Sequence, residues 1–173
     1  MASDNILKSP DYRAGTMALV GAIVIIAIAW GFELVGGYKP CPLCLQQRWA
    51  YYAAIPALFV SLILIASDQR RIAGVVLLLV SLAFLANAAL GVYHAGAEWK
   101  FWPGPDTCGG TGAITTQAGG LLKQLETARV VRCDEAPWRM FGLSFAGWNV
   151  VSSLLLWITS LQAAFATRDP ELA

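Results

Sequence analysis

Residues 72–97 read IAGVVLLLVSLAFLANAALGVYHAGA, a run without a single Asp, Glu, Lys or Arg. An α-helix rises about 1.5 Å per residue, so roughly 20 apolar residues cross the hydrocarbon core of a bilayer, which is about 30 Å thick. A buried helix of a water-soluble protein would need a polar face, which this run lacks. The run therefore predicts a membrane-spanning helix, which we place near residues 72–94.

Three further runs of this kind flank it. The stretches 14–32, 49–67 and 140–167 also contain no Asp, Glu, Lys or Arg. Pro56 in the second stretch is compatible with a span, because membrane helices tolerate proline when neighbouring groups satisfy the freed backbone. We therefore predict one all-α domain over residues 1–173, a polytopic membrane four-helix bundle whose other spans lie near 16–36, 45–66 and 142–166.

The composition of the whole chain agrees with a membrane protein. Of its 173 residues, 57% are hydrophobic and 13% are charged, and the formal net charge is +1. A soluble domain carries about 25% charged residues, and disordered chains combine low hydrophobicity with high net charge. Nucleic-acid binding requires a basic patch, for which this charge balance gives no sign. The composition thus excludes a soluble globule, a disordered chain and a nucleic-acid-binding protein, and membrane lipid is the expected surrounding.

Four spans place both termini on the same side of the membrane. The short connection 67–71 lies on that side, and the loops 37–44 and 95–141 lie on the other. Arg70 and Arg71 in the short connection favour a cytoplasmic location, because basic residues concentrate in cytoplasmic loops. We therefore expect cytoplasmic termini and two outward loops.

The second outward loop contains one helical pattern, with apolar residues on one face and polar residues elsewhere. The apolar set is Leu121, Leu122, Leu125 and Ala128, and the polar set is Lys123, Gln124, Glu126 and Arg129. This pattern predicts a short amphipathic helix on the membrane surface. A small helix packed within the loop is the alternative.

The chain has four cysteines, and under this topology all of them face outward: Cys41, Cys44, Cys108 and Cys133. Disulfides form and persist in oxidising compartments. Structural disulfides, a metal site and a redox relay are the three alternatives. A bridge within the motif CPLC of residues 41–44 would close a very short loop, which restricts the unfolded chain little. Strained, exposed disulfides are the labile or catalytic ones, so the spacing favours a redox relay.

A metal or haem site fits the cysteine spacing less well. Zinc ribbons bring two tight cysteine pairs together, and Cys108 and Cys133 do not form a tight pair. A covalently attached haem needs a histidine directly after the second cysteine of the motif, and this position holds Leu45. We therefore predict no metal site.

The residues around the motif sharpen the redox interpretation. Pro42 suits the first turn of a helix, which places Cys44 near the positive end of the helix dipole and favours its thiolate. Arg48 follows four residues later on the same face, where it would stabilise that thiolate; the alternative is an arginine that reaches lipid phosphates. His94, the only histidine, ends the third span at the same depth, as a pocket residue or as a structural hydrogen-bonding group.

Three other polar residues lie in or near the spans. We expect Glu33 to lie at the membrane interface, near the outward end of the first span. Asn87 and Asn149 fall inside spans, where asparagine more often forms hydrogen bonds between helices than takes part in chemistry.

Several motifs together resemble the disulfide bond formation protein B (DsbB) family. They are CPLC at 41–44 with Gln47-Arg48 behind it, Tyr93-His94 at the end of the third span, and the segment from Cys133-Asp134-Glu135-Ala136-Pro137-Trp138 through Phe141-Gly142-Leu143 to Trp148. The resemblance covers nearly the whole chain, and the combination is far more specific than a CxxC motif alone.

The resemblance implies an enzyme, a protein-dithiol:quinone oxidoreductase of the bacterial inner membrane. Such a protein reoxidises a DsbA-like periplasmic thiol oxidase and so sustains disulfide formation in exported proteins. The loop pair corresponds to Cys108 and Cys133, with the partner attacking Cys108. Electrons then pass to Cys41 and Cys44.

The resemblance also implies a quinone site. Cys44 would contact ubiquinone or menaquinone, and Arg48 corresponds to the arginine of that site. His94 and Trp138 are candidate lining residues by position. We further expect Cys108 and Cys133 to form a disulfide in the resting protein.

Two other functions remain compatible with the sequence. One is a quinone reductase similar to vitamin K epoxide reductase, whose CxxC motif characteristically lies late in the bundle. The other is a non-enzymatic membrane scaffold with structural disulfides. Gly109 and Gly110 after Cys108 depart from the family pattern, and a different partner oxidase would be compatible with that departure.

Overall fold

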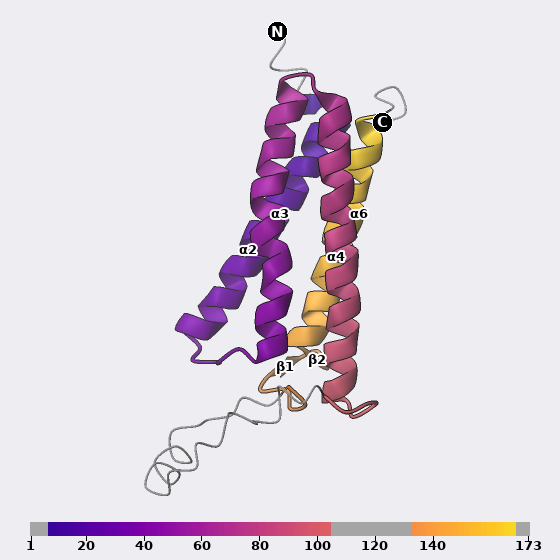
Figure 1. Ribbon diagram of the computed structural model, residues 1–173. Coiled ribbons are helices and arrows are strands. Elements are labelled where there is room, and N and C mark those ends of the chain that lie inside the picture. The colour runs from indigo at the N-terminus through magenta and orange to yellow at the C-terminus, as the bar shows by residue number, and fades with distance from the viewer. Residues whose placement is uncertain (1–6, 105–132, 169–173) are drawn as a thin grey trace, which may run out of the picture.

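The computed structural model describes residues 7–104 and 133–168 as a bundle of four long helices (Figure 1). All four are long and apolar enough to cross a membrane, which confirms the predicted all-α four-span fold. The helices are α2 (Pro10–Leu34), α3 (Pro42–Ala66), α4 (Arg70–Glu98) and α6 (Phe145–Ala166). A small antiparallel ribbon precedes the last helix and consists of β1 (Arg139–Met140) and β2 (Leu143–Ser144).

The helix ends differ from the predicted spans at the site end of the bundle. The α4 helix continues to Glu98, beyond the predicted end at residue 94. The α6 helix begins at Phe145, so the predicted start at 142 is wrong. Phe141 and Gly142 both have positive φ, 52° and 83°, and turn the chain between the two short strands. This turn prevents a helical backbone until Ser144 caps α6.

The four helices pack as a closed ring in which α2 and α4 each contact both α3 and α6. Small residues allow close approach between helices, as membrane bundles require. A Cβ added to Gly91 of α4 would lie 2.8 Å from the Cγ2 of Val150 in α6. Large apolar side chains such as Met17 and Leu79 point outward, where they face lipid.

A polar network links three helices in the middle of the bundle. The Tyr51 hydroxyl donates to Asn149 Oδ1 at 2.9 Å, and Asn87 Nδ2 donates to Ser153 Oγ at 2.9 Å. Asn87 Nδ2 also lies 3.4 Å from Asn149 Oδ1. The two asparagines therefore form hydrogen bonds between helices, as their positions within spans predict.

The opposite ends of the bundle carry different features. The beginning of α2, the α3–α4 connection and the end of α6 share one end (Figure 1). There Arg70 forms an ion pair of 2.8 Å with the fully buried Asp11, and Gly74 packs against Thr167. The motif of residues 41–44 and the ribbon lie at the other end. The predicted surface helix around residues 121–129 lies outside the described residues.

Candidate active site

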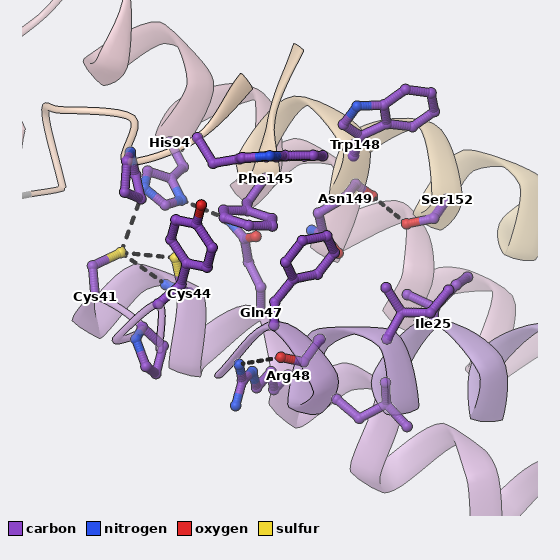
Figure 2. A pocket seen from close by; sticks show the side chains of 18 of the residues that line it. Ile25, Cys41, Cys44, Gln47, Arg48, His94, Phe145, Trp148, Asn149 and Ser152 are labelled. Atoms are coloured by element: carbon purple, nitrogen blue, oxygen red, sulfur yellow. Dashed lines mark hydrogen bonds between the residues drawn. The ribbon is translucent and has the colours of Figure 1, made fainter. Parts of the chain in front are cut away.

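A cavity of about 350 Å³ opens at the ribbon end of the bundle, between side chains from all four helices (Figure 2). Its wall on the α2 side is apolar and includes Ile25, Ala29 and Phe32. Many of its polar lining residues lie near the start of α3 and the end of α4, namely Cys41, Cys44, Gln47, Arg48, His94 and Glu98, and Asn149 and Ser152 of α6 add further polar groups. The fold therefore brings four of the predicted site residues, Cys41, Cys44, Arg48 and His94, to one cavity.

Cys41 and Cys44 occupy the first turn of α3, as free thiols. Cys41 is the N-cap residue, and Pro42 takes the first helical position, where its missing N–H is not needed. The Cys44 backbone N–H donates to Cys41 Sγ at 3.3 Å, and the two sulfur atoms lie 2.9 Å apart. Cys41 is buried, whereas Cys44 is partly exposed to the cavity.

The thiolate is favoured at Cys41 and not at Cys44, which corrects the prediction from the helix dipole. The hydrogen bond from the Cys44 side chain, together with hydrogen bonding and charge from His94, lowers the pKa of Cys41 to about 4. Burial opposes this shift. The hydrogen bond from the Cys44 side chain is the largest of these causes, and the Cys44 backbone N–H, which also donates to Cys41 Sγ, adds a smaller contribution in the same direction.

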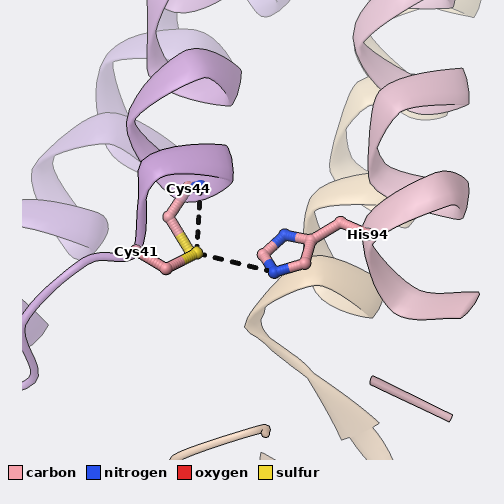
Figure 3. Close-up of side chains that lie close together, drawn as sticks. All are labelled: Cys41, Cys44 and His94. Atoms are coloured by element: carbon pink, nitrogen blue, oxygen red, sulfur yellow. Dashed lines mark hydrogen bonds between the residues drawn. The ribbon is translucent and has the colours of Figure 1, made fainter. Parts of the chain in front are cut away.

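His94 is buried and stands beside the cysteine pair (Figure 3). Its Nε2 lies 3.6 Å from Cys41 Sγ and 3.8 Å from Glu98 Oε1. Its Nδ1 lies 3.1 Å from Gln47 Nε2. An N–H on Nε2 faces Cys41, whereas the role of Nδ1 as donor or acceptor follows from which way the Gln47 amide is turned.

Sequence analysis assigns no role to Gln47 or Glu98, although both line the cavity. Glu98 is buried, and Ser144 Oγ donates a hydrogen bond to its carboxylate. The spacing along the helices could have identified both residues. Glu98 lies four residues after His94, and Gln47 lies three residues after Cys44, so each shares a helix face with a predicted site residue.

Arg48 lines the same cavity but is paired with an acid on the neighbouring helix. It forms an ion pair with Glu33 of α2, and its Nη2 donates to the Ala29 carbonyl at 3.3 Å. The Arg48 side chain is 13% exposed and that of Glu33 is 34% exposed. Glu33 is thus the ion-pair partner of a cavity-lining arginine, which its expected interfacial position did not indicate.

Trp138, a candidate lining residue of the expected quinone site, also lines the cavity. It stacks on Phe145, with ring centroids 4.8 Å apart, and packs against Phe32 at 5.1 Å. These three rings come from α2, from the segment before the ribbon and from α6. They close the apolar side of the cavity at the ribbon end.

Cys133 is buried, is part of a disulfide, and shares a small apolar cluster with Cys41 and Leu43. An ion pair of 2.6 Å between Lys100 and Asp134 holds the chain after Cys133 near the end of α4. Cys108, the predicted partner of Cys133, lies outside the described residues. The structure therefore places one cysteine of the predicted loop pair next to the cavity.

Known proteins similar to this chain include several with a described role. It is 30% identical to the Disulfide bond formation protein B of Marinobacter nauticus, over 84% of this chain and 87% of that protein. It is 28% identical to the Disulfide bond formation protein B of Xanthomonas oryzae pv. oryzae, over 94% of this chain and 93% of that protein. An uncharacterised protein of Rickettsia prowazekii is 24% identical over 89% of this chain and 88% of its own length.

No solved structure matches the chain. The match to the family described as "Disulfide bond formation protein DsbB" covers residues 12–163, which include all four helices almost completely. A membrane bundle with a cysteine pair in its cavity agrees with that description. The chain therefore belongs to the DsbB family, as a multi-pass membrane oxidoreductase of disulfide bond formation.

Proposed function

We propose that this protein reoxidises a periplasmic, DsbA-like thiol oxidase and passes the electrons to a membrane quinone. The observation that carries the proposal is the position of the Cys41–Cys44 dithiol in the wall of an apolar cavity within a membrane bundle. A structural disulfide needs no such cavity. A dithiol that must meet a lipid-soluble acceptor does.

The residues of the cavity suit ubiquinone or menaquinone. A quinone has a flat ring, an apolar tail and two carbonyl acceptors, and the cavity offers aromatic and aliphatic walls together with N–H donors. Phe32 and Ile25 would contact its apolar parts, and Arg48 and Gln47 would donate to its carbonyl oxygens. A bound quinone supplies an acceptor for two electrons and two protons.

The cysteine pairs support a relay toward the cavity. In thiol–disulfide exchange, a thiolate attacks one sulfur of a disulfide and displaces the other as a thiolate. Two such steps oxidise one dithiol and reduce one disulfide, so two electrons move and no sulfur bond is lost overall. Cys133 and Cys41 share one buried cluster, so transfer from the loop pair to the Cys41–Cys44 pair needs only a short movement.

The side chains around Cys41 suit the proton transfers of this relay. His94 holds its Nε2 proton toward Cys41 and so stabilises a thiolate there. Glu98 Oε1 lies 3.8 Å from the same Nε2, and Ser144 donates a hydrogen bond to the Glu98 carboxylate, so Glu98 is placed to receive a proton from His94.

We place the protein in the bacterial inner membrane with cytoplasmic termini. The basic residues Arg70 and Arg71 lie at the end of the bundle where the termini lie, which agrees with the preference of basic residues for the cytoplasm. The cavity end then faces the periplasm, the oxidising side, where disulfide chemistry is required.

The test is an assay of the purified full-length protein with a reduced DsbA-like oxidase and ubiquinone or menaquinone. We expect quinone reduction that depends on the dithiol oxidase and is abolished by Cys44→Ser. A folded wild-type protein that reduces neither quinone at the expense of the dithiol would overturn the proposal and leave the scaffold alternative. Activity with a quinone epoxide, and not with the dithiol oxidase, would favour the alternative similar to vitamin K epoxide reductase.

A further inference from the structure

We propose that the reduced Cys41–Cys44 pair, together with His94, forms a binding site for a thiophilic divalent metal ion such as Zn²⁺. The donor atoms of these three residues all lie within 4.8 Å of one another (Figure 3). Two thiolates and an imidazole are the preferred donors of zinc in proteins. The spacing of the four cysteines alone predicts no metal site, and the fold adds the histidine.

The distances suit tetrahedral coordination after a small adjustment. With Zn–S near 2.3 Å and Zn–N near 2.05 Å, tetrahedral donors lie about 3.6 Å apart for S and N and about 3.8 Å apart for two sulfurs. Cys41 Sγ and His94 Nε2 are already 3.6 Å apart. The two sulfurs, at 2.9 Å, must separate by about 0.9 Å. Cys44 is partly exposed to the cavity, so its side chain has room to rotate.

The surroundings provide an outer shell for the three donors. Glu98 Oε1 lies 3.8 Å from His94 Nε2 but is not among the donor atoms that lie within 4.8 Å of one another, so the fourth coordination position would be open to water, as in zinc sites with three protein ligands. Metal-binding histidines hold their other ring nitrogen in a hydrogen bond, and Gln47 is already in contact with Nδ1. Metal binding at Nε2 places the ring proton on Nδ1, where the carbonyl oxygen of the Gln47 amide would accept it.

The binding step is controlled by the redox state of the cysteine pair. The two thiols lose two protons and the metal gains two thiolate bonds, with no change in oxidation state. The disulfide form offers no thiolate, so only the reduced protein can bind the metal. Binding also occupies both sulfur atoms, and it would stop the proposed relay until the metal is removed. The site itself does not depend on the quinone.

The test uses Co²⁺ as a spectroscopic substitute for zinc on the full-length protein in detergent, reduced and freed of reductant without oxygen. We expect one Co²⁺ per chain with thiolate charge-transfer absorption, displacement by Zn²⁺, and no binding to the oxidised protein. Cys44→Ser and His94→Ala should remove the absorption. Gln47→Leu should weaken binding about 10- to 100-fold, as loss of an outer-shell partner does.

A matched control separates this site from the loop cysteines. Cys133→Ser removes a cysteine outside the donor set and should leave Co²⁺ binding unchanged. Loss of binding in Cys133→Ser, equal binding by the oxidised protein, or unchanged absorption in His94→Ala would each overturn the proposal. The measurement is the absorption of bound Co²⁺, so its result does not depend on whether the protein reduces quinone. A protein that binds Co²⁺ but reduces no quinone would refute the proposed function alone, and the reverse result would refute the metal site alone.

Discussion

Arg48 of α3, which lines the cavity together with Cys44, is ion-paired with Glu33 of α2. The pair joins two helices, and the Ala29 carbonyl takes a further hydrogen bond from Arg48. A guanidinium carries five N–H donors, so the pairing leaves donors for a ligand in the cavity. Glu33 therefore fixes the position of Arg48 without using all of its hydrogen-bonding capacity.

Arg48→Gln should weaken quinone use by roughly tenfold to a hundredfold. A hydrogen bond from a charged donor contributes about 1.5–3 kcal/mol, and each 1.4 kcal/mol is about tenfold in affinity. Steady-state kinetics at varied quinone concentration measures the effect as a rise in KM. Thiol exchange between the partner oxidase and the loop pair should be nearly unchanged, because it takes place away from Arg48.

Glu33→Gln is the matched variant. It removes the carboxylate but keeps the guanidinium, so its effect on the KM for quinone should be smaller than that of Arg48→Gln. If Arg48→Gln leaves both KM and kcat unchanged in a protein of verified folding, then Arg48 serves only to join the helices.

Cys41 in the reduced protein should react as a thiolate over the whole neutral range. Its pKa of about 4 means that deprotonation is complete well above that pH. The rate of its alkylation should then be nearly constant from about pH 5 to about pH 8. The alkylation rate of an ordinary thiol, with a pKa near 8.5, instead rises about tenfold per pH unit over this range. Mass spectrometry of the peptide containing Cys41 measures the rate in the reduced protein.

The lowered pKa of Cys41 also makes the stability of the folded protein depend on pH. The pKa of Cys41 is lowered in the folded protein from 9.0, so its contribution to stability is complete above pH 9 and is lost as the pH falls toward 4. His94→Ala should raise the pKa of Cys41, because it removes a hydrogen bond and a charge that favour the thiolate. An alkylation profile in which Cys41 of the wild type titrates near pH 8.5 would contradict this assignment.

Gly91→Ala should destabilise the bundle by about 1–3 kcal/mol, the usual cost of overpacking. The added Cβ would lie 2.8 Å from Val150 Cγ2 and 3.4 Å from Asn149 Nδ2, so α4 and α6 must move apart. Gly31→Ala is the control, because nothing lies within 4 Å of its Cβ position, and its effect should stay within about 0.5 kcal/mol. Unfolding by a denaturing detergent measures both. Equal stability of the two variants would show that α4 and α6 are not tightly packed at Gly91.

The spans could be predicted because membrane insertion is decided by local composition. Each charge-free run has the length that a bilayer requires, whatever the other helices do. The ends of the helices do not follow from that rule. Nothing between His94 and Glu98 breaks a helix, so α4 continues past the predicted end, and a turn at Phe141-Gly142 delays the start of α6.

The site residues could be predicted from the sequence only where one short segment holds all the residues of a motif. The CPLC motif identifies Cys41 and Cys44 by spacing alone. The pairing of Glu33 with Arg48 and the approach of Glu98 to His94 depend on how the helices pack against one another. The sequence alone therefore places an acid at the end of a span only at the membrane interface and does not identify its partner. The position of the thiolate likewise depends on the hydrogen bonds that Cys41 receives from Cys44 and His94, which form only in the folded protein.

Cys133→Ala should trap a mixed disulfide between the partner oxidase and Cys108 when the partner lacks its own second cysteine and quinone is present. The Cys108 thiolate attacks the Cys41–Cys44 disulfide, the partner's thiolate then displaces that sulfur from Cys108, and the released Cys41–Cys44 dithiol is reoxidised by the quinone. Cys133 is buried and disulfide-bonded, so its sulfur is poorly accessible to a soluble protein and attack at the other sulfur is favoured. Without Cys133, no neighbouring loop thiol can return to release the partner. Non-reducing electrophoresis followed by mass spectrometry of the joined peptides identifies the bond.

The reciprocal variant, Cys108→Ala, tests the direction of the relay. It leaves only the buried Cys133 in the loop pair and should trap little of the partner. Alkylation of the wild type in membranes from aerobic cells should find no free thiol at either loop cysteine, because the resting pair is a disulfide. A mixed disulfide that forms only in Cys108→Ala would mean that the partner attacks Cys133, and that the loop must first move Cys133 out of its cluster with Cys41 and Leu43.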